Sequence, residues 1–162
     1  MLALESLSNF VQLEWLPKAS QEDIKKTKKI LTEYSELKIV VDDYRKHEED
    51  LKQTIYEGEI ARRLDQEDLY ANKTANAAIL ANNQQRAAEE CDVLKVAIER
   101  AVKLIRDDEA QQAITLRYIK GYSYTETLLF LKRGEKSSTL DRRLIDGMTS
   151  VANTLKMWGI IE

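Results

Sequence analysis

The chain has 162 residues, of which 43% are hydrophobic and 33% charged, and its formal net charge is -3. Its single cysteine and single histidine exclude an intrachain disulfide and a zinc site made of cysteine and histidine ligands, so we expect neither metal nor cofactor. Helix-forming residues abound, whereas the chain has only one proline and five glycines. This composition predicts an all-α protein.

The N-terminal stretch MLALESLSNFVQLEWLPK has neither a basic start nor a long apolar run. It does not resemble a signal peptide, and no other segment is long and apolar enough to cross a bilayer. We therefore expect a cytoplasmic protein without membrane contact. Residues 3–15 predict a short helix, which Pro17 ends.

Two long helices are predicted next, the first beginning at a candidate N-cap, Ser20. Its apolar positions follow heptad spacing: Ile30, Tyr34, Leu37, Val41, Tyr44, Leu51 and Ile55. Residues 57–74 lose this spacing around Gly58 and are interpreted as a connection with at most a short helix. The second helix is expected from about Thr74 to Ile105. Its stripe comprises Ala77, Leu80, Ala87, Cys91, Leu94, Ile98, Ala101 and Ile105, with Gln84 as an interruption.

These helices suggest an N-terminal arm over residues 1–105, for which two interpretations stay open. The helices form an antiparallel hairpin, or one of them also pairs with its copy in a second chain as a coiled-coil-like homodimer. The acidic cluster from Asp107 to Glu109 suits the first turn of a new helix, so we place a domain boundary there. Residues 1–105 hold 16 Lys and Arg against 20 Asp and Glu, whereas residues 106–162 hold 9 against 8.

Residues 106–162 predict a three-helix domain. A helix from about Asp108 to Ile119 ends at Gly121, a residue suited to a left-handed helix terminus. Ser123 and Glu126 then have the spacing of a capping box and open a two-turn helix. After a polar segment, Ser137 or Ser138 is the expected cap of a third helix. Its inner stripe comprises Leu140, Leu144, Met148, Val151 and Leu155.

A capped two-turn helix, a turn and a longer helix form the layout of a helix-turn-helix, whose second helix enters the major groove of DNA. Hydroxyl and guanidinium groups at the start of that helix suit phosphates and base edges. We expect the Asp141 carboxylate to accept hydrogen bonds at the helix cap or to pair with a nearby arginine. We expect Arg142 and Arg143 to lie on the outer face of the third helix. The candidate DNA-binding residues are Arg133, Lys136, Ser137, Ser138, Thr139, Arg142 and Arg143.

The segments LRYIKGYSYTETLLFL and STLDRRL resemble sigma-factor region four. Behind a helical arm in a short chain, they are similar to the phage late-gene regulators of the ArpU/RinA group. The resemblance covers about forty residues well, and it implies sequence-specific DNA binding and activation of transcription. In two places the chain departs from the pattern. Thr127 and Leu128 stand where Ile-Ala is usual, and the connection from Leu131 to Thr139 is longer than usual.

The sequence therefore predicts a regulator that binds double-stranded DNA as a homodimer, with RNA polymerase as a candidate partner. One alternative is a phage small terminase subunit, which uses a helix-turn-helix to recruit a packaging motor. Another is a helical interaction protein that does not touch DNA. The sequence has no glycine-rich phosphate loop, paired-histidine metal motif or nucleophile elbow, so we do not expect an enzyme.

Overall fold

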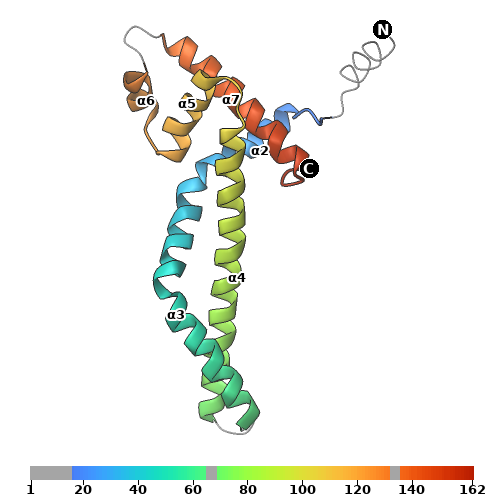
Figure 1. Ribbon diagram of the computed structural model, residues 1–162, viewed down its shortest axis with the longest axis vertical. Coiled ribbons are helices and arrows are strands. Elements are labelled where there is room, and N and C mark those ends of the chain that lie inside the picture. Colours follow the sequence, from blue (N-terminus) through green and yellow to red (C-terminus); the bar gives the residue numbers. More distant parts are fainter. Residues whose placement is uncertain (1–15, 65–68, 132–135) are drawn as a thin grey trace, which may run out of the picture. The chain divides into compact units, whose positions relative to one another are not determined.

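The computed structural model describes residues 16–64, 69–131 and 136–162, and these residues form helices and no strand (Figure 1). The all-α prediction is confirmed. The helix predicted over residues 3–15 lies outside the described residues. The elements, in chain order, are α2 (Gln21–Thr32), α3 (Tyr34–Leu64), α4 (Leu69–Lys103), α5 (Asp108–Ile114), η1 (Thr115–Ile119), α6 (Tyr124–Phe130) and α7 (Ser137–Met157).

The chain divides into two compact units. We call Glu33–Ala97 the hairpin unit. The C-terminal unit consists of Ile98–Glu162 together with the described residues up to Thr32. The division therefore differs from the expected boundary after residue 105, because α2 and the last residues of α4 belong with the C-terminal helices.

In the hairpin unit, α3 and α4 lie side by side and antiparallel (Figure 1). Gly58 faces α4 so closely that a Cβ atom added to it would lie 2.2 Å from the Ala78 Cβ and 3.0 Å from the Thr74 carbonyl oxygen. This glycine makes room for the neighbouring helix and does not end its own. The connection expected over residues 57–74 is therefore wrong, since α3 continues to Leu64 and α4 begins at Leu69.

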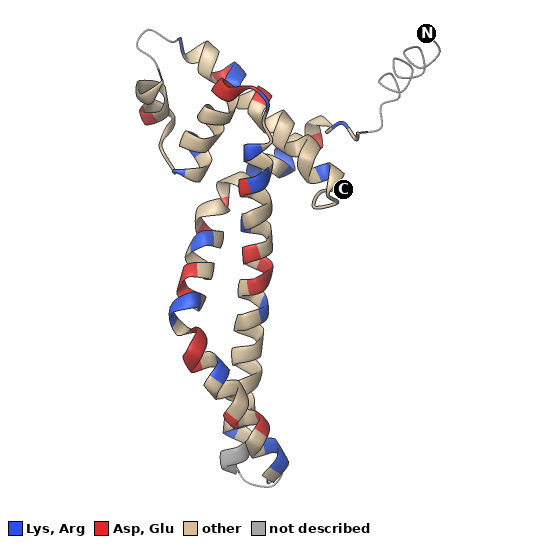
Figure 2. Ribbon diagram, viewed as in Figure 1, with Lys and Arg blue, Asp and Glu red and all other residues tan. Residues whose placement is uncertain are grey.

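Small residues face the inside of the hairpin. The buried positions among residues 72–90 of α4 are Ala78, Ala81 and Ala88, whereas Leu80 is 60% exposed. The stripe predicted through Leu80 and Ala87 is therefore displaced by one residue over this range. Alanine allows the two helices to approach closely, which a leucine at the same place would prevent. Both charge signs occur along α3 and α4 (Figure 2).

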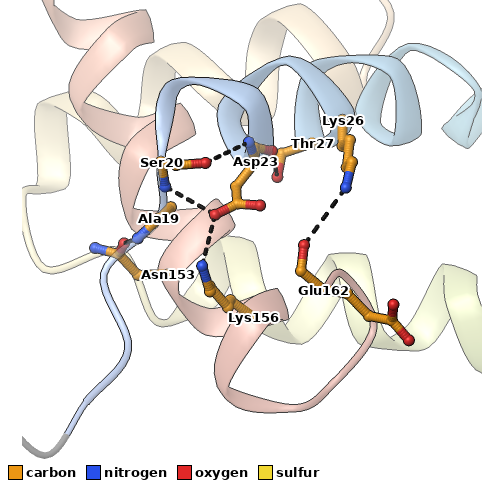
Figure 3. A network of polar contacts seen from close by, with 8 residues as sticks. All are labelled: Ala19, Ser20, Asp23, Lys26, Thr27, Asn153, Lys156 and Glu162. Carbon is orange, nitrogen blue, oxygen red and sulfur yellow. Dashed lines mark hydrogen bonds and ion pairs between the residues drawn. The ribbon is translucent and has the colours of Figure 1, made fainter.

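In the C-terminal unit, α2 is joined to α7 by polar contacts (Figure 3). The predicted N-cap is confirmed, because Ser20 Oγ accepts from the Asp23 backbone N–H at 3.2 Å. Asp23 Oδ2 in turn accepts from the Ser20 N–H and from Lys156 Nζ, each at 2.8 Å. The Ala19 N–H donates to Asn153 Oδ1 at 2.7 Å. The Lys156 ammonium and the Ser20 N–H lower the pKa of Asp23 to about 2.

The core of the C-terminal unit forms where α7 crosses α5. The inner stripe predicted for α7 is confirmed, although Leu144 is only half-buried. Ile161, after α7, is buried as well. The buried apolar residues of α5 and α7 are Ala110, Ala113, Ile114, Leu140, Met148, Val151, Ala152 and Leu155.

Candidate nucleic-acid interface

The helix expected from Asp108 to Ile119 is present as α5 followed by the π-helical turn η1. Asp107 Oδ1 caps its start by accepting from the Glu109 N–H at 2.9 Å. Gly121 follows with φ of 73°, the left-handed conformation in which a β-carbon would be strained. The chain therefore turns where the sequence predicted, and it turns into α6.

The capping box at the start of α6 is confirmed in both directions. Ser123 Oγ accepts from the Glu126 N–H at 3.1 Å, and Glu126 Oε2 accepts from the Ser123 N–H at 2.7 Å. The backbone hydrogen bond from Ser123 lowers the pKa of the Glu126 carboxyl. Two otherwise unpaired N–H groups are thus satisfied, which supports a helix of only seven residues.

Thr127 stands where the sigma-like pattern has isoleucine, and its side chain is completely buried. Its hydroxyl donates to the Ser123 carbonyl at 2.8 Å, so the buried polar atom has a hydrogen-bond partner. The helix therefore accommodates a threonine at this position. A small apolar cluster holds α6 between η1 and α7 and comprises Ala113, Leu116, Leu131 and Leu140, with Tyr122, Tyr124, Leu128 and Leu144 packed against it.

The start of α7 differs from the prediction. The N-cap is Lys136, which makes no side-chain capping bond, and the two serines are the first helical residues. Among the residues that the structure describes, Asp141 is engaged neither at this cap nor by an arginine. Its Oδ1 instead lies 2.7 Å from the Tyr124 hydroxyl, which donates either to it or to the Ser137 carbonyl at 3.1 Å. This hydrogen bond to Asp141 raises the pKa of Tyr124. The contact ties the first turn of α6 to the first turns of α7.

Five of the seven candidate DNA-binding residues lie together at the start of α7. Lys136, Ser137, Ser138 and Arg142 are exposed, and Thr139 is half-buried. Arg133 lies outside the described residues. The connection from α6 to α7 runs from Leu131 to Lys136.

Arg143 departs from the expectation, because its side chain is only 10% exposed and its Nη2 donates to Glu109 Oε2. The outer-face assignment of Arg143 is therefore wrong. The reason is its position on the helix: Arg143 follows Leu140 by three residues and precedes Gly147 by four, and both of those residues are buried. Arg143 thus faces α5, and we no longer count it among the candidate DNA-binding residues.

The exposed side of α7 continues beyond the predicted residues. Ile145 is 62% exposed and lies one turn after Arg142 on the same face. Sequence reasoning did not include Ile145, because it is apolar and adjoins the inner stripe. The exposure of Ile145 beside Ser138 and Arg142 identifies this face of α7. The face begins with polar and cationic side chains and continues with an apolar one.

No cluster of three or more histidine, cysteine or acidic residues that could hold a metal ion occurs among the described residues. None of the described helices is long and apolar enough to cross a membrane. Comparison of the chain with family models, curated proteins and solved structures found no match.

Proposed function

We propose that this chain is a sequence-specific double-stranded DNA-binding regulator of transcription that reads the major groove with the start of α7. The observation that carries the proposal is the exposed face formed by Ser138 and Arg142, on a helix held by the capped α6. Such a helix can place a guanidinium against guanine or phosphate and hydroxyls against either. The sigma-like motif favours phage late genes as targets, a bacterial cytoplasm as the location and RNA polymerase as a partner.

The distribution of charge between the two units supports the proposal. In the sequence, residues 1–32 and 98–162 together contain 16 Lys and Arg against 13 Asp and Glu, and the hairpin unit contains 9 against 15. The net charge of -3 for the whole chain is therefore the sum of +3 over residues 1–32 and 98–162 and -6 over the hairpin unit. The helix-turn-helix thus lies in the positively charged part of the chain. A positive charge there attracts the phosphates of DNA.

The proposal is tested by selecting bound duplexes from a randomised pool with the full chain. The affinity for the enriched duplex is then compared with that for a shuffled duplex of the same composition. A specific regulator binds the enriched duplex about a thousandfold or more tightly than the shuffled one at physiological salt. Equal affinity for the two duplexes would contradict sequence-specific regulation.

We further propose that the regulator is a homodimer whose chains meet through the hairpin unit. The supporting observation is a row of exposed apolar residues on α3, Tyr56, Ile60 and Leu64, which recur every four residues. Leu64 is 79% exposed, a degree of exposure that a partner chain would reduce. A dimer would also present two reading helices to two half-sites.

The mass of the assembly in solution separates the regulator from the packaging alternative. A dimer that Leu64→Gln converts to a monomer supports the regulator. A large ring would favour a small terminase subunit instead, since packaging proteins of that kind join a helix-turn-helix to a ring-forming helical part.

A further inference from the structure

The outward face of α2 carries three lysines. Lys25, Lys28 and Lys29 are exposed and fall within about 100° of the helix circumference. The opposite face of α2 holds the buried residues Asp23, Thr27 and Leu31. The lysines therefore belong to a helix that is anchored in the C-terminal unit, and they project away from its core.

Three acidic groups of the C-terminal unit are already engaged within it. Asp23 is paired with Lys156, Glu109 with Arg143, and Asp141 accepts from Tyr124. Another α2 lysine, Lys26, donates to the Glu162 carbonyl oxygen at 3.4 Å.

By contrast, Lys25, Lys28 and Lys29 form no ion pair with any residue in the described part of the chain. Their charge is therefore available to an anionic partner.

A groove connects this lysine face to the reading helix. Its walls include Lys28 of α2, Arg117 of η1, Tyr124 at the start of α6, and Asp141 and Ile145 of α7. Ile145 lies one turn beyond Arg142 on the exposed face of α7. Lys28 and the face that carries Arg142 thus border one continuous surface of the same compact unit.

From this arrangement we infer that α2 is a second DNA-contacting element, in which Lys25, Lys28 and Lys29 bind phosphates of the duplex that α7 reads. The inference rests on the proposed function and extends its site to residues distant in sequence. Lysine ammonium groups contact phosphates as point charges and carry no information about base sequence. The three lysines therefore set affinity and its dependence on salt, while Arg142 sets discrimination between sequences.

The test compares two charge-matched triple variants of the full chain. The first is Lys25→Gln with Lys28→Gln and Lys29→Gln. The control replaces three exposed lysines of the acidic hairpin unit, Lys38, Lys46 and Lys73, by glutamine. Both triples change the net charge by the same amount, and glutamine has nearly the helix propensity of lysine. Binding to the enriched and shuffled duplexes is measured from about 50 to about 200 mM salt.

For the α2 triple we expect the slope of log affinity against log salt to decrease in magnitude by about 2 to 3, since each phosphate contact contributes about 0.9. The ratio of affinities for the enriched and shuffled duplexes should stay unchanged. The control triple should keep the slope of the wild type. Circular dichroism checks that both triples remain folded.

Three results would overturn the inference. A wild-type slope in the α2 triple, with sequence preference intact, would remove α2 from the interface and leave the proposed function standing. Equal loss of slope in both triples would show an effect of overall charge alone. Absence of binding by the wild type to any duplex would overturn both the inference and the proposed function.

Discussion

The Arg143 guanidinium lies 2.5 Å from the Glu109 carboxylate and joins α7 to the first turn of α5. Glu109 is more than half exposed, so the pair is only partly shielded from water. Arg143 therefore fixes the orientation of α7, and the neighbouring Arg142 is left to face outward. Of these two adjacent arginines, Arg143 is largely buried and contacts α5, whereas Arg142 is exposed on the surface.

Removing the charge of Glu109 should destabilise the C-terminal unit. Glu109→Gln leaves the largely buried Arg143 without its carboxylate, and we expect the free energy of unfolding to fall by about 2 kcal/mol. Asp108→Asn is the matched control, because Asp108 is exposed in the same helical turn and loses only the helix-dipole contribution, below about 1 kcal/mol. Urea midpoints at constant m-value measure both changes. Equal losses would show that the pair does not orient α7.

Gly147→Ala should destabilise the protein although it raises helix propensity. A Cβ atom at residue 147 would lie 2.4 Å from Ile114 Cγ1 and 3.1 Å from the Ala110 carbonyl oxygen, where α5 and α7 cross. We expect a net loss of about 1–3 kcal/mol from overpacking. Ile114→Ala removes the clashing atom, so the double variant should lose less than the sum of the single losses. Additive losses would contradict a steric conflict between these residues.

The free energy of unfolding should depend on pH because Asp23 of α2 is paired with Lys156 of α7. The folded pKa of Asp23, about 2, lies below its ordinary value of 3.8, so the contribution of the Asp23 contacts is present above about pH 4. It is lost progressively as the pH falls from about 4 towards 2. Asp23→Asn should therefore lower stability at neutral pH and reduce its pH dependence within this window. Denaturant midpoints at several pH values test this, with the exposed Glu22→Gln as the control.

Tyr124→Phe should loosen the connection between α6 and α7. The variant loses the hydroxyl that lies 2.7 Å from Asp141 Oδ1. We expect a decrease in the free energy of unfolding and faster amide exchange in the first turns of α7. Tyr122→Phe is the control, since Tyr122 packs against the same apolar cluster. If the two variants behaved alike, the Tyr124 hydroxyl would have no specific role.

Local signals in the sequence predicted most of the C-terminal elements. The Ser123 and Glu126 spacing gave the capping box, and Gly121 marked the turn, because caps and left-handed turns depend on a few neighbouring residues. The burial of Arg143 was not predictable in this way. On the edge of a helix stripe, the partner helix decides which side chain is enclosed, and Glu109 is distant in the sequence.

The same limitation explains the differences in the helical arm. Gly58 was interpreted as a break because glycine weakens helices, whereas here it permits close contact with Ala78. The stripe in α4 followed the larger Leu80, although the close approach of the helices selects alanine. The contact between Asp23 and Lys156 joins residues 133 positions apart, which no local periodicity records.

The most direct test of the account is the effect of Arg142→Ala on sequence discrimination. Arg106→Ala is the matched control, because it removes an exposed arginine from the same unit outside α7. Affinities for the enriched and shuffled duplexes are measured at one salt concentration. We expect Arg142→Ala to reduce the ratio between them by about 5- to 150-fold without loss of stability, while Arg106→Ala preserves it. An unchanged ratio in Arg142→Ala would contradict the assignment of α7 as the reading helix.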